Sequence, residues 1–131
     1  MNILIDTHIL VWTLDKNSPL SAKHKEMLED VSNRVFASQI NLMELSIKKN
    51  LKRLPEFVPD ISEVAKQCLI NGFEILAISN EHIFTYQHLP LFNEHRDPFD
   101  RFLIATAIKE DFVIMTTDEK FHLYSSLIKI I

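Results

Sequence analysis

The stretch Ile3-Leu4-Ile5-Asp6, near the start of the chain, decides the fold. Its apolar residues follow one another without alternation, which is typical of a strand that is buried on both faces. A second apolar run, Val113-Ile114-Met115-Thr116-Thr117, also leads into an aspartate, Asp118. The carboxyl ends of parallel strands lie along one edge of a sheet, and ligands bind at that edge. The sequence therefore predicts that Asp6 and Asp118 lie together at such an edge.

Strands alternate with helices along the whole chain. Apolar runs predict strands at residues 2–6, 35–38, 73–78, 112–117 and 127–131. Capping residues and helical periodicity predict helices at residues 7–14, 21–32, 38–50, 60–71, 79–89 and 97–111, with a further helical turn after Asp118. Gly72 is expected to end the helix at 60–71. This order predicts an α/β fold with a mainly parallel sheet of about five strands and helices on both faces.

The composition is that of a soluble globular protein, with 47% hydrophobic and 24% charged residues. A length of 131 residues suits a single domain spanning residues 1–131. No signal peptide is recognised, and no segment approaches the roughly 20 apolar residues of a membrane span. The lone Cys68 excludes an intrachain disulfide and favours a reducing, cytoplasmic setting. The net charge of −4 argues against broad nucleic-acid binding, although a bound metal would reverse the local sign at an acidic site.

Carboxylates gathered at one sheet edge repel one another and lose hydration unless a cation joins them. Mg²⁺ and Mn²⁺ are hard cations that take oxygen ligands of this kind. Glu44 belongs to the set because it lies only about a turn and a half of helix beyond the strand end at Ser38. The sequence therefore predicts a site for Mg²⁺ or Mn²⁺ whose candidate ligands are Asp6, Glu44, Asp97, Asp100 and Asp118.

Each aspartate also has a purely structural interpretation. Asp97 precedes Pro98 and is a natural helix N-cap. Asp100 lies in the first helical turn, where the helix dipole favours an acid. Asp6 and Asp118 suit caps or turns. The metal hypothesis rests on all of these acids meeting at one end of the sheet.

Four segments, in this order, resemble PIN-domain ribonucleases. They are Leu4-Ile5-Asp6-Thr7-His8, Ser38 with Met43-Glu44-Leu45, the HRDPFDR stretch at 95–101 with Ile104-Ala105, and Thr116-Thr117-Asp118. The similarity covers essentially the whole chain, and the HRDPFDR stretch is its most specific part. The branch that the chain resembles most is that of the VapC-like toxins of type II toxin–antitoxin pairs.

This resemblance implies a three-layer α/β/α sandwich and a metal-dependent endoribonuclease that leaves 5′-phosphate and 3′-hydroxyl ends. It implies a homodimer and a small cognate antitoxin as partner. Asp6, Glu44, Asp100 and Asp118 would form the catalytic acidic quartet, and Asp97 remains open as a further ligand or as the cap that positions Asp100. The small hydroxyl residues that would hold a water or a carboxylate beside the metal ligands are Ser38 and Thr116 or Thr117.

Two groups of basic residues are candidates for binding RNA. The first group follows Glu44 on the same helix and just beyond it, and the second flanks the HRDPFDR acids. A solvated surface is the alternative for the first group, and neutralisation of the carboxylates is the alternative for the second. The candidates are Lys48, Lys49, Lys52, Arg53, Arg96 and Arg101.

Other chemistries find little support in the sequence. The six histidines show no paired zinc-ligand spacing, and we expect His95 to be a loop surface residue. No nucleophile elbow and no glycine-rich phosphate loop is present. Two alternative functions remain, namely a catalytically inactive PIN-fold binding module and a receiver-like phosphoacceptor domain. Metal-dependent RNA cleavage that is lost in an Asp6→Asn variant would separate a nuclease from both.

Overall fold

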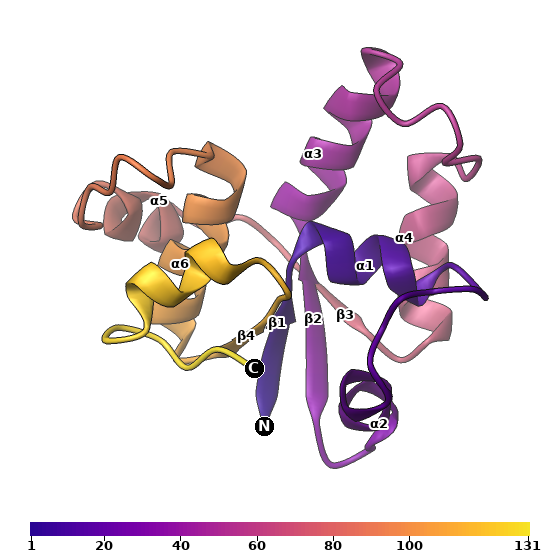
Figure 1. The fold of residues 1–131 in the computed structure, drawn as a ribbon, viewed down its shortest axis with the longest axis horizontal. Helices are drawn as coiled ribbons and strands as arrows, with labels where there is room; N and C mark the ends of the chain where they lie inside the picture. Colours follow the sequence, from indigo (N-terminus) through magenta and orange to yellow (C-terminus); the bar gives the residue numbers. More distant parts are fainter.

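Four parallel strands form the central sheet of the computed structural model, which describes residues 1–131. The strands are β1 (Asn2–Ile5), β2 (Arg34–Ser38), β3 (Glu74–Leu76) and β4 (Val113–Met115), and their spatial order is β3-β2-β1-β4. β1 pairs in parallel with both β2 and β4, and β2 pairs in parallel with β3. All four strands therefore end at the same edge of the sheet (Figure 1).

Helices cover both faces of this sheet, as the alternation of elements predicted. Helices α1 (Thr7–Thr13), α2 (Ala22–Glu29) and α4 (Ile61–Ile70) lie to the right of β1 and β2 in Figure 1, and α3 (Gln39–Asn50) lies above the ends of the strands. Helices α5 (Asn80–Tyr86) and α6 (Pro98–Glu110) lie to the left, with the short 3₁₀ helix η1 (Glu119–Tyr124) beside them. None of these helices has the length and apolar character needed to cross a bilayer.

The apolar core has two halves, one on each face of the sheet. Ile3 and Ile5 of β1 belong to one cluster of buried side chains, which includes residues of α1, α3 and α4. Leu4, between them, belongs to the other cluster, which is built largely from α6 and η1. Successive residues of a strand point to opposite faces. The unbroken apolar run of β1 is therefore explained by a sheet that is covered on both sides.

The predicted fifth strand is the main departure from the expected sheet. Residues 127–131 make only one parallel bridge, between Ile130 and Ile114. The turn that follows η1 uses the first two residues of this segment, because the amides of Leu127 and Ile128 both bond to the carbonyl of Tyr124. Only the last residues are left to bond with β4. The sheet accordingly has four strands rather than about five.

Helix starts agree well with the sequence, whereas several ends differ. Ser21, Ser38 and Asp60 cap α2, α3 and α4 with their side chains. Helix α2 ends at Glu29 rather than near residue 32, and α5 ends at Tyr86 rather than near residue 89. Strand β3 is limited to Glu74–Leu76. N-caps are local side-chain interactions, and for this reason they are the more predictable boundaries.

Two helices end in the same hydrogen-bond motif with different residues at its left-handed position. After α4, the amides of Gly72 and Phe73 bond to the carbonyls of Leu69 and Cys68, and Gly72 has φ +81°. After α3, Lys52 has φ 57° and occupies the equivalent position. This is the Schellman motif, in which glycine carries no steric cost.

Lys52→Gly is therefore expected to stabilise the protein by roughly 0.5–1 kcal/mol. Gly72→Ala should destabilise it by about 1 kcal/mol, although nothing lies within 4 Å of the added Cβ, because the cost is conformational. Urea unfolding of both variants measures these changes. Two variants with wild-type stability would contradict this interpretation of the helix ends.

Candidate active site

Asp6 lies at the end of β1 and caps α1. Its Oδ1 accepts a hydrogen bond from the amide of Ile9 at 2.8 Å, and its Oδ2 accepts one from the hydroxyl of Thr116. The same hydroxyl oxygen accepts the amide of Asp118 at 3.0 Å. Thr116 therefore ties the ends of β1 and β4 together and holds two of the predicted acids next to each other.

Glu44 comes from the second turn of α3 and is also buried. Its Oε1 accepts a hydrogen bond from the Thr7 hydroxyl at 2.6 Å. The Thr7 oxygen in turn accepts a hydrogen bond from Nδ2 of Asn41 at 3.0 Å. Its Oε2 lies 2.8 Å from the ammonium of Lys48, one turn along the helix. Asn41 is fixed through its own Oδ1, which accepts the amide of Ser38 at 2.7 Å. Glu44 is thus held between a neutral hydroxyl and a cation.

Asp97 and Asp100 begin α6, as the sequence predicted for a helix with proline at its first position. Oδ1 of Asp97 accepts the amides of Phe99 at 2.9 Å and Asp100 at 3.3 Å, which confirms its role as N-cap. Oδ2 of Asp100 lies 3.2 Å from Nε2 of His95. The two carboxylates therefore have different surroundings, since Asp97 is exposed and Asp100 is partly buried.

These acids meet at one cleft of about 200 Å³ whose lining contains no hydrophobic residue. Glu44, Asp97, Asp100 and Asp118 line it, and Asp6 lies behind Asp118 through Thr116. The rest of the lining is polar or basic and consists of Thr7, His8, Lys48, His95, Arg96 and Lys120. The structure thus brings the predicted acids, from four separate segments of the chain, to one end of the sheet.

The electrostatics of the site reflect burial of charge. Burial raises the pKa of Asp6 above its usual 3.8, against the lowering effect of the bonds from Ile9 and Thr116, and the charge of Asp118 raises it further. Burial likewise raises the pKa of Asp100 to about 6, with the bond to His95 opposing it and Asp97 and Glu44 adding repulsion. The favourable contacts of Asp6 and Asp100 therefore do not fully offset the cost of burying their charges.

The donor set fits a hard divalent cation, because every acid at the cleft offers oxygen and no thiol is present. The side chains are not arranged as a finished site, since no three histidine, cysteine or acidic groups converge in metal-ligand geometry. The Lys48 ammonium lies beside Glu44 at this point and supplies positive charge. A cation bound to Oε2 of Glu44 would compete with the Lys48 ammonium for that oxygen.

The basic residues selected from the sequence lie in different settings. Lys48 and Arg96 line the cleft, while Lys52 and Arg53 are exposed beyond the end of α3. The Lys49 ammonium donates to three backbone carbonyls, those of residues 57, 58 and 59, at 3.1, 3.3 and 2.6 Å. Lys49 therefore fastens the loop between α3 and α4.

Arg101 is not at the surface, although the sequence grouped it with the RNA-binding candidates. It is only 5% exposed and donates to the Pro90 carbonyl and the Tyr124 hydroxyl. His95, expected at a loop surface, is only 2% exposed and lies against Asp100. The expectation for His95 was wrong because the loop before α6 folds inward onto η1.

Among the candidate supporting hydroxyls, Thr116 contacts a carboxylate, whereas Ser38 caps α3 and Thr117 is exposed without a hydrogen bond. Sequence reasoning missed Thr7 and Asn41, which position Glu44. Thr7 follows Asp6 within the first of the four segments, whereas Asn41 lies between Ser38 and Glu44 and is not part of the second. Their closeness to Asp6 and Glu44 was the only signal that could have identified them.

The pKa of Asp100 predicts a pH-dependent stability. The folded protein keeps the Asp100 proton up to about pH 6, whereas the unfolded chain releases it near 3.8. Raising the pH through this window therefore costs stability, and Asp100→Asn removes the cost. In EDTA, the free energy of unfolding of Asp100→Asn should exceed that of wild type by roughly 1–3 kcal/mol at pH 7.5. At pH 4 the two free energies should be nearly equal. An equal difference at both pH values in urea unfolding would refute this.

Several solved structures share the fold of this chain, all at low sequence identity. VapBC from Salmonella typhimurium, solved bound to DNA, matches with a TM-score of 0.68 and 18% identity, over 100% of this chain and 97% of that one. VapBC2 from Rickettsia felis, bound to a promoter DNA fragment, matches with a TM-score of 0.65 and 18% identity, over 100% of this chain and 98% of that one. VapBC-1 from nontypeable Haemophilus influenzae matches with a TM-score of 0.62 and 20% identity, over 100% of this chain and 97% of that one. These similarities show the fold.

A search of curated proteins found no match. The model of the PIN domain family, in contrast, matches residues 3–126, which is nearly the whole chain. The match includes all the acids at the cleft and every strand of the sheet except the first residue of β1. This chain therefore belongs to the PIN domain family.

Proposed function

We propose that this chain is a divalent-metal-dependent endoribonuclease and the VapC-like toxin of a type II toxin–antitoxin pair. The observation that carries the proposal is the gathering of acids from α3, α6 and the segment after β4 around one polar cleft, with Asp6, which follows β1, directly behind it. The rim of this cleft is basic, with Lys48, Arg96 and Lys120. Acids for a metal beside cations for phosphates suit a phosphodiester substrate.

We assign Asp6, Glu44, Asp100 and Asp118 to holding Mg²⁺ or Mn²⁺, with Asp97 as the cap that positions Asp100. The bound ion would supply an activated water and would stabilise the negative charge that develops on the phosphate. Thr7 and Thr116 hold their carboxylates by hydrogen bonds and so keep the carboxylate oxygens aligned.

Phosphate binding is assigned to the basic residues that are exposed or line the cleft. Lys48 would leave Glu44 when the metal binds and would then face the substrate. Arg96 and Lys120 flank the acids, and Lys52 and Arg53 extend the basic surface beyond α3. Lys49 and Arg101 are left out of this set because backbone carbonyls and the Tyr124 hydroxyl already use their donors.

The inactive-module alternative is less well supported. A binding module would have no need to keep four strand-end and helix acids together against their repulsion, and burial of Asp6 and Asp100 raises the pKa of each. The receiver-like alternative does not hold, because the chain belongs to the PIN domain family.

Incubation with RNA tests the proposed activity directly. Cleavage should require Mg²⁺ or Mn²⁺, stop in EDTA, and leave 5′-phosphate and 3′-hydroxyl ends, which sequencing of the product ends would identify. Cleavage that continues in EDTA, or 2′,3′-cyclic phosphate ends, would contradict metal-dependent hydrolysis. The activity is proposed for the cytoplasm, in keeping with a single, buried, unpaired cysteine.

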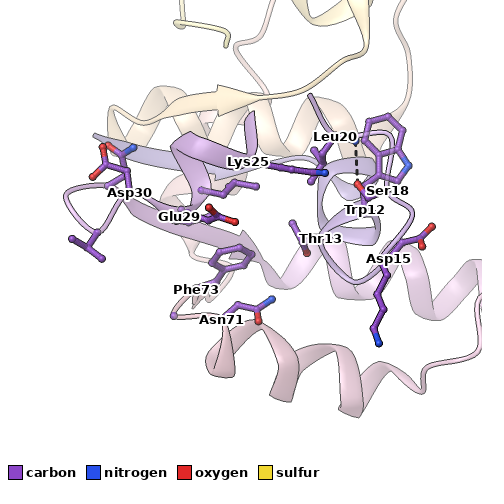
Figure 2. Close-up of a pocket in the computed structure, with 16 residues that line it drawn as sticks. Trp12, Thr13, Asp15, Ser18, Leu20, Lys25, Glu29, Asp30, Asn71 and Phe73 are labelled. Carbon is purple, nitrogen blue, oxygen red and sulfur yellow. Dashed lines mark hydrogen bonds between the residues drawn. The ribbon is translucent and has the colours of Figure 1, made fainter. Parts of the chain in front are cut away.

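An antitoxin is the proposed protein partner, since VapBC structures share this fold. Two hollows of about 740 and 830 Å³ adjoin each other at the end of α1 and share Trp12. Figure 2 shows Trp12 and Phe73 at the first of them, with α2 beside it. Val31 in the first hollow and Val58 in the second are 101% and 87% exposed. We propose that the antitoxin covers these apolar side chains.

Val31→Asp and Val58→Asp should therefore each weaken antitoxin binding at least about tenfold, because each buries a charge in the complex. Both side chains are exposed, so folding and RNA cleavage should be unchanged. Binding to the purified small protein encoded beside this chain would be measured by calorimetry. Leu91→Asp, at a residue 90% exposed in another loop, is the matched control. Equal losses in all three variants would contradict this location.

A homodimer is also proposed, and α5 offers an apolar surface for it. Ile83 and Phe84 are 50% and 54% exposed. Light scattering on the purified chain distinguishes a dimer from a monomer. A monomer at all accessible concentrations would refute this part of the proposal.

A further inference from the structure

A chain of hydrogen bonds runs from the protein interior to the acidic cleft. Nη1 of Arg101 donates to the Tyr124 hydroxyl oxygen at 2.8 Å, and that oxygen lies 3.0 Å from Nδ1 of His95. Nε2 of His95 lies 3.2 Å from Oδ2 of Asp100. These hydrogen bonds join α6, η1 and the loop before α6, which are adjacent in Figure 1.

The direction of this chain follows from the chemistry of its members. A guanidinium only donates, so the Tyr124 oxygen accepts from Arg101. The Tyr124 hydroxyl proton then has one acceptor within reach, namely Nδ1 of His95. With the Tyr124 proton directed at Nδ1, that nitrogen carries no proton, and a neutral ring then has its proton on Nε2, which lies 3.2 Å from Oδ2 of Asp100. Arg101, Tyr124 and His95 thus form a relay in which each group donates toward the cleft.

The relay is rigid because it is buried and packed. Arg101, Tyr124 and His95 are 5%, 0% and 2% exposed. The His95 ring lies 5.5 Å from the ring of Phe121, and the Tyr124 ring meets Phe92 edge-on at 5.1 Å. Water therefore has little access to the imidazole, and rotation of the ring would break bonds at both nitrogens.

We propose that His95 is a positioning residue for Asp100, and that Arg101 and Tyr124 fix His95 in the tautomer that donates from Nε2. His95 holds Oδ2 of Asp100 and leaves Oδ1 without a hydrogen bond, free to face the cleft. This proposal rests on the proposed function, since it gives a task to a carboxylate assigned to the metal. It also explains why an arginine inside the HRDPFDR stretch is buried rather than exposed to RNA.

Tyr124→Phe tests the relay, because it removes the hydroxyl and keeps the ring. Nuclear magnetic resonance of ¹⁵N-histidine protein reports which ring nitrogen of His95 is protonated. Wild type should show a single tautomer with the proton on Nε2, and Tyr124→Phe should show a mixture or the other tautomer. Mn²⁺ affinity, measured by electron paramagnetic resonance, should fall about 10–100-fold.

Tyr86→Phe is the matched control. The Tyr86 ring lies under the same guanidinium, with 5.4 Å between its centroid and Arg101, but the Tyr86 hydroxyl is not part of the relay. His95→Gln, which retains an N–H donor, should recover Mn²⁺ affinity that His95→Leu loses. An Nδ1-protonated His95 in wild type, or a folded Tyr124→Phe protein with unchanged tautomer and affinity, would overturn the inference. Tight Mn²⁺ binding without RNA cleavage would overturn only the proposed function.

Discussion

Asp118→Asn is expected to lower the rate of RNA cleavage at least about 100-fold, the effect of removing one charged group from a site that stabilises a transition state. Among the proposed metal ligands, Asp118 is the residue whose substitution should disturb the fold least. Oδ1 of Asp118 accepts the Lys120 amide at 3.0 Å, and the asparagine oxygen can keep that bond. The loss should therefore come from the missing charge and not from unfolding. Cleavage of a labelled RNA under single-turnover conditions measures it.

Glu63→Gln is the control for this experiment, because Glu63 is an exposed acid in the first turn of α4 and outside the cleft. It should cleave RNA at the wild-type rate. Asp118→Asn should unfold at the wild-type denaturant concentration or higher, and Glu63→Gln at most slightly below it, because Glu63 interacts favourably with the dipole of α4. Wild-type cleavage by Asp118→Asn would remove this residue from the proposed quartet.

Divalent metal is expected to stabilise the wild-type protein strongly. A ligand at a hundredfold excess over its Kd adds about 2.7 kcal/mol to the free energy of unfolding. For a domain of this size, that amounts to a Tm increase of roughly 8–12 °C. The physical reason is that the cation relieves the repulsion and desolvation that raise the pKa values of Asp6 and Asp100. Thermal unfolding with Mn²⁺ and with EDTA measures the increase.

Asp118→Asn should shrink the Mn²⁺-induced increase to a small fraction of the wild-type value. Lys48→Met provides the opposite test, because the Lys48 ammonium competes with a cation at Glu44, 2.8 Å away. This variant should be less stable in EDTA and should gain more from Mn²⁺. An increase of equal size in wild type, Asp118→Asn and Lys48→Met would show that the metal stabilises the protein elsewhere.

The elements of the fold that could be predicted from the sequence are those with local causes. The unbroken apolar run of β1 identified a strand covered on both sides, and Asp97 before Pro98 identified the start of α6. The PIN-domain resemblance identified the order of the acids. The prediction of a strand at 127–131 was wrong, because the first residues of this segment form the turn after η1. That competition depends on where Tyr124 lies in the folded protein.

In the candidate site, too, features with local causes could be predicted from the sequence, and features that depend on distant partners could not. Acids that follow strands are brought together by the parallel sheet, and therefore the sequence pattern was informative. The settings of His95, Lys49 and Arg101 depend on partners distant in the chain, such as Tyr124 and the carbonyls of the loop at 57–59. A charged or polar residue in a motif is equally consistent with a ligand contact and with a buried support. The structure was needed to distinguish the two.

The position of Mn²⁺ in crystals of this protein, located by its anomalous scattering, tests the central claim most directly. We expect anomalous density in the cleft bordered by Glu44, Asp100 and Asp118, with Asp6 beside it and the Lys48 ammonium displaced from Glu44. The density should be absent in crystals of Asp118→Asn soaked in the same solution. Density only outside this cleft, in a protein whose RNA cleavage depends on Mn²⁺, would contradict the claim that these carboxylates share a cation.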